Sequence, residues 1–161
     1  MKKNLFYLFA LICSMSLFTA CSSDDDDNNN DLTLEQVIDE QLVGTYAGTF
    51  DITSNGMSLG SDIAQDVILT KSSANALKLE VKNLAISEDL VLDISLEPCT
   101  VVEANGLYTF EGSQTVSVGT LGTFPVTVGG AFTDGNVAMD ITVLQVPMLN
   151  QVDVTFEGSK K

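Results

Sequence analysis

The 161-residue sequence has no histidine, no arginine and no tryptophan. Without histidine, Ser-His-Asp and Cys-His catalytic sites and histidine-ligated zinc sites are excluded. Seven lysines stand against 22 acidic residues, and an acidic surface of this kind repels nucleic acid. Only Tyr46 and Tyr108 among the residues after position 20 could supply a large polar aromatic ring, which argues against an aromatic platform for sugars.

Residues 1–20 have the features of a secretory signal, with Lys2 and Lys3 before an apolar run. The run is short for a membrane span, which takes about 20 apolar residues. Its end, LFTAC, resembles a bacterial lipobox, in which the cysteine is diacylated before cleavage. The resemblance implies a mature lipoprotein that begins at Cys21 and is anchored in the outer membrane by its lipid. The alternative is an ordinary signal peptide cleaved nearby, with Cys21 as a bystander.

Residues 21–31 contain no apolar residue after the cysteine, so we expect a flexible acidic tether. Its four aspartates resemble the acidic export signal of surface lipoproteins in the Bacteroidota, which implies exposure at the cell surface. The alternative is a solvated spacer. An EF-hand is excluded because the run lacks spaced ligands and a glycine at the sixth position. The candidate export residues are Asp24, Asp25, Asp26 and Asp27.

Cysteine usage and charge describe the mature chain further. Cys13 would be removed with the signal and Cys21 would carry lipid, so Cys99 stays unpaired and is expected to be a small buried hydrophobe. Removal of residues 1–20 takes two of the seven lysines and none of the 22 acids, which leaves a formal charge of −17. The remaining length suits one domain, which we place at residues 32–161.

The pattern from residue 33 predicts one short helix. Apolar residues recur at spacings of three and four from Leu34 to Leu42, and Thr33 and Gln36 have capping-box spacing. The helix should end near Gly44. We expect its apolar stripe to cover the following domain as a lid or plug.

After Gly44 the sequence predicts an all-β domain. Apolar and polar residues alternate, for example over 77–82, 90–97 and 137–143, which is typical of strands with one buried face. We expect about eight antiparallel strands in an up-and-down β-barrel, because closure removes the exposed sheet edges that invite aggregation. The alternative is a two-sheet β-sandwich. Tight turns are predicted at Ser54-Asn55-Gly56, Ala104-Asn105-Gly106 and Asp134-Gly135-Asn136.

Three segments resemble strands of the calycin-like β-barrel domain found in lipoproteins of gut Bacteroidota, which is similar in architecture to lipocalins. They are residues 43–50 (VGTYAGTF), 66–71 (DVILTK) and 152–158 (VDVTFEG). The resemblance covers residues 43–158 and implies a closed barrel. Tyr46 stands where the lipocalin signature has tryptophan. The family supplies no activity or cofactor that the resemblance could imply for this chain.

No catalytic residue, metal site or cofactor is predicted. Paired carboxylates could serve a glycosidase only if they faced one cleft. The candidates fall on the polar phase of their strands, so we expect them to face solvent; they are Asp66, Asp93, Asp140 and Asp153.

The predicted function is therefore binding. Apolar inward positions would give a barrel lumen suited to a small hydrophobic ligand. Alternatively, side chains fill the barrel, and an envelope protein or a glycan binds the loops around Asn55, Asn105, Asp134 and Leu149. Met57, Met139 and Met148 are expected in core or loop positions. The candidate lumen residues are Leu79, Leu92, Ile94, Phe110, Phe124, Val126, Met139, Ile141, Val154 and Phe156.

Overall fold

The computed structural model describes residues 32–87, 90–118 and 122–161. The predicted signal (1–20), Cys21 and the export residues Asp24–Asp27 lie outside the described residues. Leu32–Lys161 forms one compact unit that contains the whole barrel and its core cluster. This unit thus has its own hydrophobic core, which is what a domain needs to fold alone.

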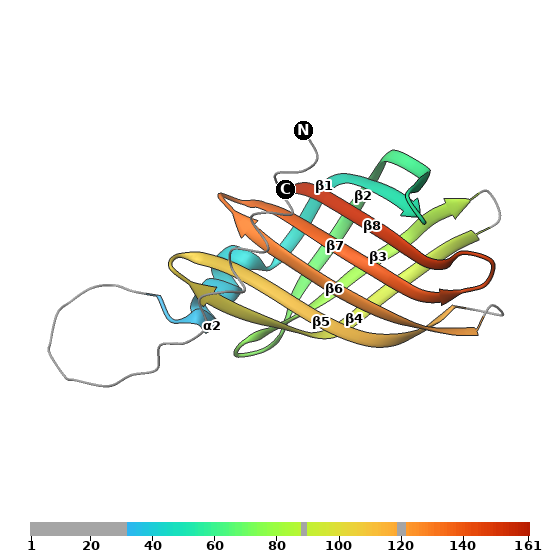
Figure 1. Cartoon of the computed structure of the whole chain (residues 1–161). Helices are drawn as coiled ribbons and strands as arrows, with labels where there is room; N and C mark the ends of the chain where they lie inside the picture. The colour runs from blue at the N-terminus through green and yellow to red at the C-terminus, as the bar shows by residue number, and fades with distance from the viewer. Residues whose placement is uncertain (1–31, 88–89, 119–121) are drawn as a thin grey trace, which may run out of the picture. The chain divides into compact units, whose positions relative to one another are not determined.

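The described residues form a short helical segment and eight strands, which close in sequence order into an antiparallel barrel (Figure 1). The first strand pairs with both the second and the eighth, and this last pairing closes the sheet. The prediction of a barrel is confirmed over that of a two-sheet sandwich. The elements are α2 (Leu34–Val37), η1 (Ile38–Leu42), β1 (Gly44–Ser54), β2 (Met57–Ser73), β3 (Ala76–Ser87), β4 (Leu90–Ala104), β5 (Leu107–Val118), β6 (Gly122–Thr133), β7 (Asn136–Val146) and β8 (Asn150–Lys160).

Three hairpin turns have the geometry that their sequences predict. Asn55 and Gly56 have φ angles of 49° and 78°, and the residues at 105–106 and 134–135 repeat this pair of values within a few degrees. Two successive positive φ angles are what a two-residue type I′ turn requires, and Asn, Asp and Gly adopt them at the lowest steric cost. These turns fix the register of the strands on either side.

The helix begins and ends where the sequence predicts. Thr33 and Gln36 form the capping box, with the Gln36 amide donating to Thr33 Oγ1 (3.3 Å) and the Thr33 amide donating to Gln36 Oε1 (2.9 Å). α2 continues into η1, a single π-helical turn, and the chain enters β1 at Gly44. The capping box satisfies amide groups that a helix N-terminus otherwise leaves without partners.

β2 is longer than its clearest sequence signal at residues 66–71. It begins at Met57 and runs for 17 residues. Its pairing with β1 shifts register on either side of Ile52, and Asp62 has a φ of 55°. Bulges of this kind break the period of two, so the first half of the strand carries no clean alternation in the sequence.

Candidate binding site in the barrel interior

Alternate residues of each strand line the inside of the barrel, because successive side chains in a strand point to opposite faces. The ladder between β1 and β8 places Phe50 opposite Phe156 and Ile52 opposite Val154, all four buried. The backbone of Leu92 pairs with Leu84, while the Leu92 side chain is outside the described part. The other candidate lumen residues are all buried: Leu79, Ile94, Phe110, Phe124, Val126, Met139, Ile141, Val154 and Phe156. That they surround an open lumen stays a prediction.

The helical segment covers one end of the barrel, which we call the plug end (Figure 1). Val37, Ile38 and Leu42 are buried and belong to the same core cluster as the inward strand residues. The Tyr46 hydroxyl donates to the Leu42 carbonyl oxygen (2.9 Å), which ties η1 to β1. Burial raises the pKa of Tyr46 to about 12, so this hydroxyl keeps its proton at neutral pH. The helix therefore acts as the plug that its apolar stripe predicts.

Two lysines hold the plug to the strands. Lys71 of β2 donates to Glu35 Oε1 (2.8 Å) and Asp39 Oδ2 (2.6 Å), and Lys160 donates to the Gln41 carbonyl oxygen (2.9 Å). The hydrogen bond with Asp39, followed by that with Glu35, raises the pKa of Lys71. These contacts lie at the surface, where ion pairs contribute little stability. Apolar burial is thus the main force that holds the plug, and the lysines fix its orientation.

Aromatic rings fill the interior next to the plug. The ring centroids of Tyr46 and Phe132 lie 6.0 Å apart, and those of Phe110 and Phe132 lie 5.2 Å apart. Phe50 and Phe156 form a third tilted pair at 4.9 Å. All three distances fall in the range for favourable aromatic pairs. This half of the barrel is closed by large side chains as well as by the helix.

The opposite end, which we call the far end, is built differently. The β1–β2 and β7–β8 hairpins are joined there by the buried Ser54, whose hydroxyl donates to the Gln151 carbonyl oxygen (2.7 Å) and shares its hydrogen with that of Leu149 (3.3 Å). Asn55 Nδ2 also donates to the Leu149 oxygen (3.1 Å). These bonds place the two hairpin tips side by side.

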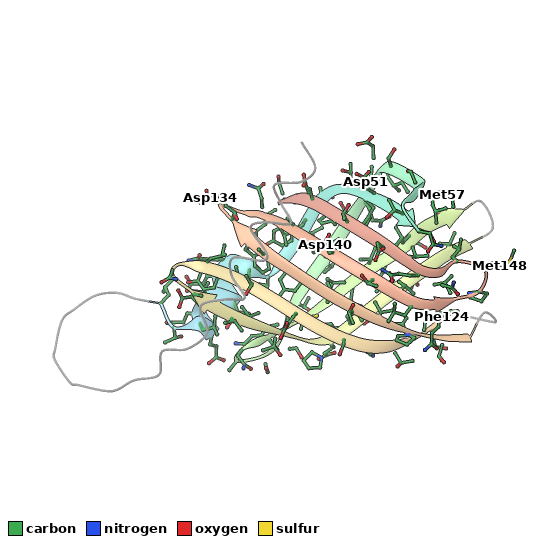
Figure 2. The ribbon with its side chains drawn as sticks, in the orientation of Figure 1. Asp51, Met57, Phe124, Asp134, Asp140 and Met148 are labelled. Carbon is green, nitrogen blue, oxygen red and sulfur yellow. The ribbon has the colours of Figure 1, made fainter. Side chains whose placement is uncertain are left out.

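Two methionines are exposed on these tips. Met57 has 64% of its surface exposed and Met148 is completely exposed, and Figure 2 shows both at the far end. Met139, in contrast, is buried in the core. The sequence predicts a core or a loop position for each of the three methionines, and the position of each residue along the barrel axis decides which of the two it occupies. The inward residues at this end include the smaller Val152 and one aromatic ring, that of Phe124.

A sequence profile for the calycin-like beta-barrel domain matches residues 42–159. The chain belongs to this family. The match begins at the last residue of η1 and ends within β8, so the calycin-like domain is the whole closed barrel.

A solved structure supports the same fold. A "putative outer membrane protein" of Bacteroides fragilis superposes with a TM-score of 0.62 at 18% sequence identity, over 80% of this chain and 53% of that protein. The calycin-like chain thus spans about half the length of its structural relative. No protein with a curated description matches the sequence. At this identity the likeness concerns the fold alone.

The acidic residues of the calycin-like barrel do not converge on an internal cleft. Asp66, Asp93 and Asp140 are exposed on the outside of the barrel, and Asp153 is half-buried. Asp153 accepts hydrogen bonds from Thr142 Oγ1 (3.0 Å) and Gln151 Nε2 (2.8 Å). Desolvation of the carboxyl by the atoms around it, with the charge of Asp153 as a second cause, raises the pKa of Asp140. In the described ranges no group of three or more Cys, Asp or Glu side chains could hold a metal ion.

Cys99 is buried and unpaired, as its sequence context predicts. Its thiol lies 3.6 Å from the Leu96 carbonyl oxygen, and burial raises its pKa to about 11. A thiol with a raised pKa holds little of the reactive thiolate at neutral pH. Cys99 therefore serves the core of the barrel.

Among the residues that the structure describes, no helix has the length and apolarity to cross a membrane.

Proposed function

We propose that this protein is a non-catalytic lipoprotein of the outer membrane that binds a small hydrophobic molecule inside its barrel, entering at the far end. The observation that supports this proposal is the structural difference between the two ends of the barrel. Helix and aromatic rings occupy the plug end, whereas apolar inward stripes run toward exposed methionines at the far end. Binding sites for small apolar ligands are concave and lined by such residues.

Thermal melts of residues 32–161 test this proposal. A hydrophobic dye, fatty acids, sterols and bile acids are compared with soluble oligosaccharides. A ligand that binds only the folded barrel should stabilise it by about 2.7 kcal/mol when its free concentration is a hundredfold above its dissociation constant. A shift with oligosaccharides alone, or with none of the compounds, would contradict binding in the interior.

A matched pair of variants locates the binding site. Val126 and Thr127 are neighbours in β6, and the first side chain is buried while the second is exposed. Val126→Phe adds a ring to the interior and should abolish the ligand-induced shift. Thr127→Phe adds the same ring to the outside and should leave the shift intact. Equal loss in both variants would place the ligand elsewhere.

A filled barrel is the second candidate. Tyr46, Phe50 and Phe156 are among the largest fully buried side chains, and an eight-stranded barrel is about the size that side chains can fill. An envelope protein or a glycan would then bind the loops, of which those around Asn55 and Leu149 meet at the far end and those around Asn105 and Asp134 lie at the plug end. A melting shift with oligosaccharides, lost on substitution of Asn55 but not of Val126, is the result that distinguishes this candidate.

The proposed lipid anchor rests on the lipobox resemblance, and the name of the structural relative, an outer membrane protein, agrees with an envelope location. Metabolic labelling with palmitate should mark the full chain. Cys21→Ala should lose the label, and Cys13→Ala, a matched change within the predicted signal, should keep it. Equal labelling of both variants would contradict acylation at Cys21.

Exposure at the cell surface rests on the four aspartates behind Cys21. Changing Asp24–Asp27 to asparagine should reduce cleavage by protease added to intact cells, because the acidic signal is lost while the length is kept. Changing Asn28–Asn30 to serine is the matched control and should have no effect. Unchanged surface cleavage in the aspartate variant would mean that the four aspartates act only as a spacer.

A further inference from the structure

Exposed apolar side chains gather on the two hairpins that meet at the far end. Met57 and Leu59 begin β2, and Met148 lies in the turn before β8; their exposed fractions are 64%, 40% and essentially complete. The hydrogen bond from Asn55 to Leu149 joins these hairpins. We call Met57, Leu59 and Met148 the far-end patch. Methionine adapts to irregular apolar surfaces, which suits it to ligand contact.

Carboxylates flank the far-end patch on the same two hairpins. The backbone amide of Asp62 donates to Asp51 Oδ1 (3.0 Å), so the Asp51 carboxylate lies against the backbone of Asp62 on the β1–β2 hairpin. Asp153 lies on β8 opposite Thr53 of β1. Figure 2 shows Asp51 with Met57 and Met148 toward one end of the barrel, away from Asp134. The apolar patch thus has a negatively charged border.

The lysines of the described barrel lie elsewhere. Lys71 is near the end of β2, Lys78 near the start of β3, and Lys160 and Lys161 at the end of β8, all toward the plug end, while Lys82 is in the middle of β3. Within the described ranges, ion pairs involve Lys71, Lys78 and Lys161, and none reaches the carboxylates beside the patch. The sequence has no lysine or arginine in the far-end connections 55–56 and 147–149.

We propose that the far end selects hydrophobic molecules that carry a positive charge and disfavours anionic ones such as fatty acids. The inference rests on the proposed function and adds the chemical class of the ligand. The apolar part packs on the methionines and continues into the barrel, while the charged group stays at the rim near Asp51, Asp62 and Asp153. A carboxylate at the same place would meet three like charges without a cation to offset them.

Three probes with one ten-carbon chain test the selection: decylamine, decanol and decanoate. Titration calorimetry of residues 32–161 at neutral pH gives their dissociation constants. Exposed opposite charges contribute about 0.2–1 kcal/mol each, so the three carboxylates should favour decylamine over decanoate by about tenfold or more, with decanol between them. High ionic strength should reduce the preference, because salt screens exposed charges.

The net charge of the protein attracts any cation, so two variants that remove the same charge separate local from general attraction. The double variant Asp51→Asn and Asp62→Asn keeps the acceptor oxygen for the Asp62 amide and should lose most of the preference. The control, Glu103→Gln with Asp134→Asn, changes hairpins at the plug end and should keep it. A cooperative melt of each variant verifies folding.

A second pair isolates the apolar contribution. The double variant Met57→Ser and Met148→Ser should weaken the binding of all three probes and leave the ratios of their dissociation constants unchanged. Val102→Ser, at a residue that is also exposed but lies near the plug end of β4, should weaken none of them.

The outcomes separate this inference from the proposed function. If decanol binds but decanoate binds as well as decylamine, or if both charge variants change the preference equally, the charge selection is wrong and the apolar carrier stands. If no probe binds, both proposals fail. If a basic amphipathic peptide binds and decylamine does not, the far-end patch belongs to a protein partner. A dimer that dissociates in the methionine variant would assign it to a second copy of the chain.

Discussion

Gly48 tests the closure of the barrel directly. It lies in β1 opposite Gly158 of β8, in the pairing that joins the first strand to the last. A Cβ atom added at Gly48 would overlap the Glu157 carbonyl oxygen and lie 2.6 Å from the Gly158 Cα atom. Ordinary contacts of a Cβ atom are 3.4–4 Å. Because the obstacles are backbone atoms, no side-chain rotation can relieve the overlap, and Gly48→Ala must push the two strands apart.

The expected cost follows from two terms. Overpacking in a dense region costs about 1–3 kcal/mol. Widening the ladder also weakens about two backbone hydrogen bonds, at roughly 0.5–1.5 kcal/mol each. Loss of glycine freedom in the unfolded chain offsets about 0.4–1 kcal/mol. We therefore expect Gly48→Ala to lower the free energy of unfolding by about 3 kcal/mol.

Gly129 supplies the matched control, because it lies in β6 with no atom within 4 Å of an added Cβ. Gly129→Ala should leave stability unchanged or raise it by up to about 1 kcal/mol. Urea unfolding of residues 32–161, followed by far-ultraviolet circular dichroism, measures both variants. If Gly48→Ala unfolds within about 0.5 kcal/mol of Gly129→Ala, β1 and β8 do not approach each other as the structure describes.

Three further predictions concern the plug and the outer face. In urea unfolding, Ile38→Ala should destabilise the barrel by about 2–5 kcal/mol, as truncation of a buried side chain does. Lys71→Met should cost under about 1 kcal/mol, because the ion pairs of Lys71 are exposed. If Lys71→Met cost more than Ile38→Ala, ion pairs would be the main force that holds the plug. The pKa of Tyr46 rises from 10.0 to about 12 on folding, so the stability from its neutral hydroxyl is complete below pH 10 and is lost as the pH rises toward 12. Tyr46→Phe should be less stable at neutral pH, through loss of the bond to Leu42, and should lose less stability over that alkaline window in a pH series of melts. Asp140 has a raised pKa and is destabilising when ionised, so Asp140→Asn should raise the melting temperature at neutral pH, with no gain under acid conditions that protonate the wild-type carboxyl.

Much of the fold could be predicted because its rules are local. Alternation from residue 77 to 82 marks a strand whatever its partner, and Asn-Gly at 55–56 demands a tight turn wherever it occurs. The start of β2 could not be predicted in the same way, since the register shifts around Ile52 and the positive φ of Asp62 break the alternation there. A bulge depends on the pairing partner, and no single strand contains that information.

The candidate site could be predicted only in its interior. An inward residue is apolar in either half of the barrel, so Phe110 near the plug and Phe124 near the far end give the same sequence signal. Exposure of Met57 depends on its height along the barrel axis, which is set when β1 pairs with β8 at the other side of the sheet. Long-range closure of this kind has no signature in a local pattern.

The charge difference between the two ends follows from the way the plug is anchored. A helical segment of nine residues over α2 and η1 is too short to be stable alone in water, so tertiary contacts must hold it. Glu35 and Asp39 on the segment need a cation at the adjoining strand, and Lys71 supplies it. Lys160 reaches the last turn, where free carbonyl groups attract positive charge. A chain with few lysines that places them at the plug leaves the far end acidic. The proposed preference for a cationic ligand is therefore tied to the same residues that close the opposite end.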